Sequence, residues 1–183
     1  MGRRPEPEIK QRLLDACTDH ALEHGLPDRL DPLVRATGTS ARMLIYHFGT
    51  RDALLSAILD SARQRQLVTF GDVLRVQPDR PYTVTLAQAW AFMTGPEGRP
   101  YLRMFGLWRE SAAQQHRPGF RRAATTDWLG PLEEGLRSMD RPELATLVLA
   151  VIRGLLMDLD ATEDRDRADE AFTHFLSTLD AHE

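Results

Sequence analysis

Apolar residues recur at helical spacing through most of this 183-residue chain, and alternating β-branched stretches bounded by turns are almost absent. The first such segment, about residues 8–24, places Leu13, Cys17 and Ala21 on one stripe. The chain is therefore predicted to be all-α. Further helices are expected at about 31–38, 40–48, 50–76, 82–94, 100–115, 120–138, 142–161 and 165–181.

Composition is that of a soluble globular protein, with 42% hydrophobic and 27% charged residues. The N-terminal residues lack the apolar run of a signal peptide, and the most apolar later segment is interrupted by Arg153 and Asp158. The single cysteine, Cys17, lies in an apolar-periodic segment and is expected to be a buried structural thiol. These features predict a cytoplasmic protein that does not insert into a membrane.

Charge is divided unevenly along the chain. The formal net charge is −4, of which residues 1–51 contribute +1 and the remaining residues −5. A surface that binds a polyanion is therefore expected near the N-terminus.

Two short helices joined by a glycine turn are expected between residues 31 and 48. Asp31 can cap the first of them, Gly38 ends it, and Ser40 can cap the second. This arrangement is a helix-turn-helix, whose second helix enters the major groove of DNA. In that second helix, Leu44 and Phe48 lie four residues apart and are expected to anchor it to the core.

The opposite face of the second helix carries side chains suited to DNA. Arg42 can donate two hydrogen bonds to a guanine, and Met43 can pack on a thymine methyl group. Tyr46 and His47 can donate to phosphate oxygens, although partial packing of these two side chains in the core remains an alternative.

The next helix offers a second contact with the DNA backbone. Its N-terminus presents free backbone N–H groups together with Thr50 and Arg51, which is a suitable seat for a phosphate. Arg3 and Arg4 can reach the DNA from a loose N-terminal arm.

Residues 8–60 resemble the tetracycline-repressor (TetR) family of transcriptional regulators, on Gly38, Ser40, Leu44, Tyr46-His47-Phe48 and Arg51-Asp52-Ala53-Leu54-Leu55. The resemblance implies that positions 41–43 and 46–47 meet DNA, that position 51 binds phosphate, and that the C-terminal helices dimerise and hold an effector. It implies a DNA-binding domain at 1–55 and a ligand-binding and dimerisation domain at 56–183. The predicted DNA-binding residues are Ser40, Ala41, Arg42, Met43, Tyr46, His47, Thr50 and Arg51.

Two positions depart from the family pattern. Leu30 and Asp31 stand where a threonine and a basic residue usually touch DNA, so Asp31 is expected to cap the helix or to accept from a cytosine amino group. Arg42 and Met43 replace a usual small residue, so the family's operator sequences do not transfer to this chain.

Aromatic residues and methionines are concentrated in the middle of the chain. Such a concentration suits an apolar pocket for a small apolar or amphipathic effector, although aromatic stripes at helical spacing are more often core. The predicted lining residues are Trp90, Met93, Met104, Phe105, Trp108 and Trp128.

The last two helices are predicted to form a homodimer interface. The apolar band between Pro142 and Thr162 is too wide for a helix with one solvated face, and Gly154 would permit close approach of a second copy. The predicted interface residues are Val148, Ile152, Leu155, Leu156, Leu159, Phe172, Phe175 and Leu176.

The sequence as a whole predicts a repressor that binds double-stranded operator DNA as a homodimer and is released by its effector. A dimeric helical interaction module that has lost specific DNA binding is the alternative. An enzyme is not expected, because no catalytic arrangement stands out. No metal or cofactor is expected: His20 and His24 lack an evident third ligand, and the aspartate-rich segment around Glu163 lacks the glycine of a calcium loop.

Overall fold

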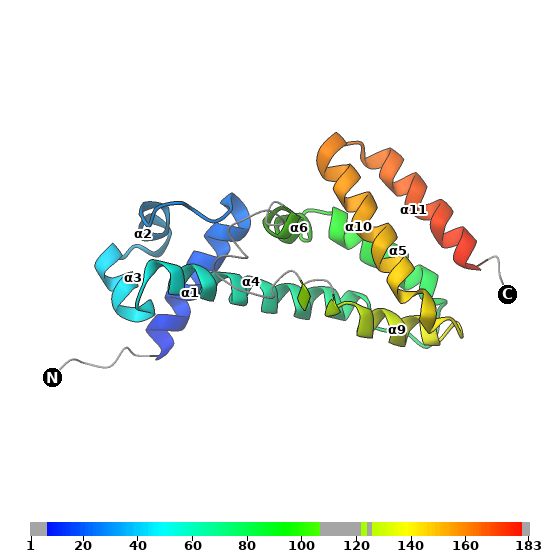
Figure 1. Cartoon of the computed structure of the whole chain (residues 1–183), viewed down its shortest axis with the longest axis horizontal. Helices are drawn as coiled ribbons and strands as arrows, with labels where there is room; N and C mark the ends of the chain where they lie inside the picture. The colour runs from blue at the N-terminus through cyan, green and yellow to red at the C-terminus, as the bar shows by residue number, and fades with distance from the viewer. Residues whose placement is uncertain (1–6, 107–121, 124–125, 181–183) are drawn as a thin grey trace. The chain divides into compact units, whose positions relative to one another are not determined.

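The computed structural model of the chain describes residues 7–106, 122–123 and 126–180 (Figure 1). Over these residues the secondary structure is helical, without a strand, which confirms the predicted all-α fold. The helices are α1 (Pro7–His24), α2 (Asp31–Thr37), α3 (Ala41–Phe48), α4 (Arg51–Val73), α5 (Tyr82–Thr94), α6 (Arg99–Gly106), α9 (Leu129–Arg137), the 3₁₀ turn η2 (Pro142–Leu144), α10 (Ala145–Thr162) and α11 (Arg165–Asp180).

The described residues pack into two units, each with its own hydrophobic core. The first unit contains residues 7–66 and 103–106, and the second contains 67–102, 122–123 and 126–180. The first core extends past residue 55, where the sequence places the domain boundary, because Ile58, Leu59 and Ala62 of α4 are fully buried in it. Helix α4 thus begins in the first unit and ends in the second.

Helices α1, α2 and α3 pack against one another in the first unit. Their buried apolar side chains form one cluster with those of α4, and an ion pair adds to this packing. The guanidinium of Arg65 on α4 bonds to the carboxylates of Asp15 (2.8 Å) and Asp19 (2.5 Å) on α1. The cluster comprises Leu13, Cys17, Ala21, Leu33, Leu44, Phe48, Leu54, Leu55, Ile58, Leu59 and Ala62.

Helix α2 begins one residue earlier than its predicted cap implies. Leu30 occupies the cap position without a side-chain hydrogen bond, and Asp31 is the first helical residue. The expectation that Asp31 caps this helix is therefore wrong. Its carboxylate instead lies in the first turn, where the helix dipole favours a negative charge.

In the second unit α10 contacts α9 and α11, and α11 contacts α5. The ring of Tyr82 at the start of α5 is buried, and its hydroxyl donates to the backbone oxygen of Leu74 (3.1 Å). Burial, followed by the nearby Glu134 carboxylate, raises the pKa of Tyr82 to about 12. Figure 1 shows α10 and α11 running side by side.

A polar network joins the end of α5 to the start of α11. The indole N–H of Trp90 donates to a carboxylate oxygen of Asp169 (2.6 Å), and the indole stacks on the ring of Phe172 with centroids 4.7 Å apart. The guanidinium of Arg165 bonds to the other oxygen of Asp169 and to the hydroxyl of Thr94 (3.3 and 3.2 Å). Trp90 is therefore held on both its polar and its apolar side.

Most predicted helix bounds are confirmed to within a few residues, and 82–94 is found unchanged as α5. The segment 142–161 is interrupted, since η2 precedes α10. Parts of the predicted segments 100–115 and 120–138 lie outside the described residues. No helix of the described chain is long and apolar enough to cross a membrane.

Candidate functional site

Backbone geometry fixes both ends of α3. Gly38 ends α2 in the left-handed conformation (φ 65°), which L side chains rarely adopt. Ser40 then caps α3, as predicted, because its hydroxyl accepts a hydrogen bond from the backbone N–H of Met43 (3.2 Å). At the other end, the N–H of Gly49 donates to the carbonyl of Ile45 (2.7 Å). Helices α2 and α3 and the turn between them form a helix-turn-helix.

Helix α3 has one buried face and one exposed face. Leu44 and Phe48 are buried in the first core, in agreement with their predicted anchoring role. Arg42 is exposed, and large fractions of Met43 (41%) and Tyr46 (46%) are exposed as well. The arginine, the methionine and the tyrosine therefore lie on the side of α3 that faces away from the core.

His47 does not share that exposed face. Only 6% of it is exposed, and its Nδ1 atom has no hydrogen-bond partner among the described residues. The ring meets that of Tyr46 edge to face, with centroids 5.2 Å apart. Position 47 follows Leu44 by three residues and so lies on the same buried side. The structure thus favours the alternative in which this histidine packs in the core.

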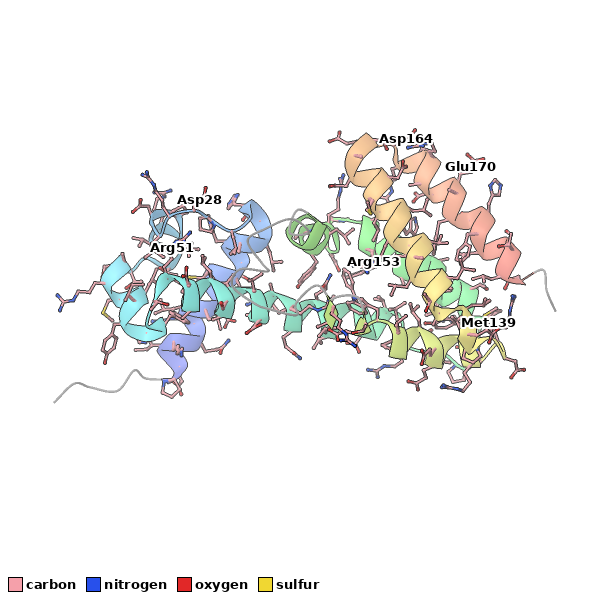
Figure 2. All side chains as sticks on the ribbon, viewed as in Figure 1. Asp28, Arg51, Met139, Arg153, Asp164 and Glu170 are labelled. Atoms are coloured by element: carbon pink, nitrogen blue, oxygen red, sulfur yellow. The ribbon has the colours of Figure 1, made fainter. Side chains whose placement is uncertain are left out.

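The N-terminus of α4 lies next to α3 in the chain. The hydroxyl of Thr50 accepts from the N–H of Ala53 (3.0 Å), as a cap does. The Arg51 guanidinium, predicted to bind phosphate, donates through Nη2 to the backbone oxygens of Pro27 (3.3 Å) and Asp28 (2.7 Å). Figure 2 shows Arg51 and Asp28 next to each other.

Basic side chains occur on α1, α2 and α3 of the first unit. Ala41 and Arg42 are exposed at its start, and Arg35 is exposed in the last turn of α2. The ammonium group of Lys10 lies 5.4 Å from the centre of the Phe48 ring, at the C-terminal end of α3. Cationic groups at both ends of the helix suit a polyanionic partner. Arg3 and Arg4 of the predicted arm lie outside the described residues.

The aromatic residues expected to line a pocket occupy two places in the second core. Trp90 and Met93 are buried, and Trp90 is engaged with α11 as described above. Trp128 is half-buried and lies 5.8 Å from the ring of Phe70. The side chains of Met104 and Phe105, and all of Trp108, lie outside the described residues.

Phe70 is not among the predicted pocket residues, although it lies at the centre of an aromatic cluster. Besides Trp128, its ring meets those of Phe92 and Tyr101 edge to face, each at 5.7 Å between centroids. Phe70 lies on α4, for which the sequence predicts a role only at the N-terminus. Its apolar character was the only signal in the sequence, and such a signal is common to all core residues.

Five of the eight predicted interface residues contribute to the core of their own chain. In the single chain these side chains belong to the core of the second unit, to which α5, α9, α10 and α11 contribute. Leu155, Leu156 and Phe175 are half-buried. The five buried residues are Val148, Ile152, Leu159, Phe172 and Leu176, and the interface itself stays a prediction.

An exposed apolar stripe nevertheless lies on α10. Leu147 and Met157 are 49% and 50% exposed, and Ala150 and Gly154 lie exposed between them. These four residues are called the α10 outer face below. Their spacing of three or four residues puts them on one stripe of the helix.

His20 and His24 lie near each other on α1. Their rings lie 4.7 Å apart, and burial, followed by the charge of His24, lowers the pKa of His20. No group of three or more metal-ligating side chains occurs in the described part of the chain.

Comparisons with solved structures find the same fold in transcriptional regulators. No protein-family model and no curated protein sequence matches the chain. A solved transcriptional regulator from Rhodococcus sp. Rha1 is similar over 93% of this chain and 95% of its own, with a TM-score of 0.72 and 19% identity.

Two other solved structures are similar over nearly their full length. The multidrug binding protein EbrR, complexed with imidazole, matches 95% of this chain and 93% of its own, with a TM-score of 0.63 and 23% identity. The TetR transcriptional regulator SCO0520 from Streptomyces coelicolor matches 93% of this chain and 97% of its own, with a TM-score of 0.51 and 17% identity. The chain therefore has the fold of the TetR-family transcriptional regulators.

Proposed function

We propose that this protein is a transcriptional regulator that binds operator DNA as a homodimer and is released from it by a small molecule. The observation that carries the proposal is the exposed face of α3, where Arg42, Met43 and Tyr46 stand on a helix anchored by Leu44 and Phe48. Contact with water alone gives no reason for a tyrosine and a methionine on the outer face of a helix. A helix that contacts base edges uses both kinds of side chain.

Each exposed side chain of α3 has a distinct role in the proposed complex. The guanidinium of Arg42 donates two hydrogen bonds to one guanine, and Met43 contacts a thymine methyl group. The hydroxyl of Tyr46 donates to a phosphate, and the backbone N–H groups at the start of α4 bind another phosphate. Arg42 and Met43 therefore determine the sequence, and the phosphate contacts set the position of the helix.

The α10 outer face supports the proposed homodimer. Leu147 and Met157 are half-exposed apolar side chains on one stripe, and Gly154 between them allows a second helix to approach closely. A second copy of the same helix would cover this face. Two copies are also what a helix-turn-helix needs, because a single one reads only half of an operator.

The Phe70 cluster supports a site for the effector in the second unit. Phe92, Tyr101 and Trp128 are only partly buried around Phe70, so they offer aromatic surface to a planar apolar molecule. A neighbour in fold, EbrR, is a multidrug binding protein. The effector changes DNA occupancy if it binds more tightly to a state in which α4 is tilted and the recognition helices no longer fit their grooves.

A salt titration on selected DNA tests the DNA-binding part of the proposal. The purified protein is used to enrich duplexes from a random library, and binding to the enriched and to shuffled duplexes is measured from about 50 to about 200 mM salt. The logarithm of the binding constant should fall linearly with that of the salt concentration, by about 0.9 per phosphate neutralised. The enriched duplex should bind at least about a thousandfold more tightly than the shuffled one. A dimer that enriches no duplex would be an interaction module instead.

A ligand screen tests the effector part. Planar aromatic amphiphiles should quench tryptophan fluorescence, raise the melting temperature and weaken binding to the enriched duplex. Tyr101→Ala should weaken all three responses, because it removes half-buried aromatic surface from the Phe70 cluster. Compounds that raise the melting temperature equally in this variant would place the effector elsewhere.

A further inference from the structure

The side chain of Arg51 is engaged within its own chain. Its Nη2 atom donates to the backbone oxygens of Pro27 and Asp28, at 3.3 and 2.7 Å. Its Nη1 atom lies 3.7 Å from a carboxylate oxygen of Asp52. Only 38% of the side chain is exposed. The guanidinium thus joins the start of α4 to the loop between α1 and α2, as Figure 2 shows for Arg51 and Asp28.

These contacts close a ring of chain that contains the whole helix-turn-helix. The ring begins at Pro27, continues through α2 and α3, and ends at Arg51. Within it, α3 is attached to α2 through the Gly38 turn and to α4 through the Gly49 turn. Closing such a ring restricts the orientations that the two helices can take relative to α4. Hydrogen bonds from a charged donor are strong enough to hold it closed.

The same contacts make Arg51 a poor ligand for phosphate. A guanidinium that binds a phosphate through two parallel hydrogen bonds uses a pair of neighbouring N–H groups. Here Nη2 already serves two carbonyl oxygens, and the nearby Asp52 carboxylate repels a phosphate that approaches Nη1.

We propose that Arg51 is a positioning residue, which holds the α1–α2 loop to the start of α4 and thereby sets the orientation of α3 toward DNA. The inference rests on the proposed DNA-binding function and deepens it. A phosphate contact would strengthen binding to every DNA sequence. The contacts of Arg51 with Pro27 and Asp28, called the latch below, would instead strengthen binding to the correct sequence. It also gives a route by which movement of α4 reaches the helix-turn-helix.

The test compares Arg51→Gln with the wild type on the enriched and the shuffled duplexes. A latch predicts that the ratio of the two affinities falls about tenfold or more, while affinity for the shuffled duplex and its salt slope stay unchanged. A phosphate contact predicts an equal loss on both duplexes and a salt slope shallower by about 0.9. A shallower slope on the shuffled duplex, or an unchanged affinity ratio, would overturn the proposal.

Two further variants serve as controls for the loss of charge and for misfolding. Arg137→Gln makes the same change of charge on α9, outside the first unit, and should leave both affinities unchanged. If Arg51→Gln does not fold, Arg51→Lys replaces it. Lysine keeps the charge, but its nitrogen lies one bond nearer the backbone, so it should lose specificity and keep affinity for the shuffled duplex. Wild-type binding of Arg51→Lys to both duplexes would contradict the latch.

A measurement on the free protein separates this inference from the proposed function. Backbone amides at 28–35 should exchange hydrogen several-fold faster in Arg51→Gln than in the wild type, while the melting temperature changes little. If the wild-type protein enriches no duplex, the proposed function fails, and the exchange experiment alone decides the latch. Unchanged exchange at 28–35 would overturn it.

Discussion

Gly135 on α9 leaves the space that the ring of Tyr82 fills. A Cβ atom at position 135 would overlap the ring atoms of Tyr82, which is itself almost fully buried. Gly130, on the same helix, has no neighbouring atom near the corresponding position. The two glycines therefore differ in the contacts that a methyl group would make, although they lie in one helix.

Gly135→Ala should lower the free energy of unfolding by about 1–3 kcal/mol, because the added methyl group displaces a buried ring. Gly130→Ala should leave it unchanged or raise it by up to about 1 kcal/mol, since alanine favours a helix over glycine. Urea denaturation of both variants makes the comparison. Equal stability of the two variants would mean that Tyr82 does not pack against α9 as described.

Cys17 should make stability depend on pH in the alkaline range. Burial raises the pKa of its thiol from 9.0 to about 11. Between these values the unfolded thiol loses its proton while the folded thiol keeps it, so the stabilisation is complete below pH 9 and is lost as pH rises to 11. The loss is on the order of 2 kcal/mol.

Cys17→Ala removes this titration and is the natural control. The free energy of unfolding of the wild type should fall more steeply from pH 9 to 11 than that of the variant, as measured by urea denaturation in the presence of a reductant. Parallel curves would show that the thiol titrates alike in both states.

Single residues show how far sequence reasoning reaches. Cys17 was predicted to be buried, and it is, because the apolar stripe of a helix packs against the core and the thiol lies on that stripe. The side chains of His47 and Arg51 were predicted to meet DNA, and they face their own chain. The residues that contact His47 and Arg51 include residues of other parts of the chain. The local sequence around each of the two does not indicate which distant residues it contacts.

At the scale of elements, local signals determine α3 well. Gly38, Ser40 and Gly49 delimit it through backbone conformation and capping, so its bounds were predictable. For α10 the apolar pattern was predictable, but the partners of each side were not. Hydrophobic periodicity predicts that an apolar face of α10 is buried. It does not indicate whether α5, α9, α11 or a second copy covers that face.

The α10 outer face gives the prediction at this scale. Leu147→Glu combined with Met157→Glu should weaken the homodimer at least tenfold, because both charges would be buried against a second copy. Sedimentation over a range of concentrations measures the change, and circular dichroism checks that the variant is folded. Phe172→Glu would be a poor test, since that side chain is in the core and its replacement unfolds the monomer.

Val84→Glu is the matched control for the dimer experiment. Val84 is an exposed apolar residue on α5 of the same unit, at a distance from the α10 outer face in sequence. It should leave the dimer intact. If the double variant and the control sediment alike as dimers, the interface lies on another surface.

For the whole molecule, the uneven distribution of charge and the helix-turn-helix motif lead to the same location for DNA binding. The exposed arginines of α2 and α3 lie within the part of the chain that carries net charge +1, while the remainder carries −5. In the proposed complex, repulsion of DNA by the acidic remainder would help to orient the protein on approach. The central claim is therefore that α3 reads base sequence, one copy in each half of an operator.

Sequencing the duplexes enriched by the wild type and by Arg42→Ala tests that claim most directly. The wild type should enrich an inverted repeat whose half-sites lie about 10 base pairs apart or a multiple of this. Arg42→Ala should enrich the same repeat with the preference for one guanine in each half-site relaxed, at a cost of about 1–3 kcal/mol in binding to the wild-type sequence. Enrichment of no repeat, or of an identical repeat by both proteins, would contradict the account.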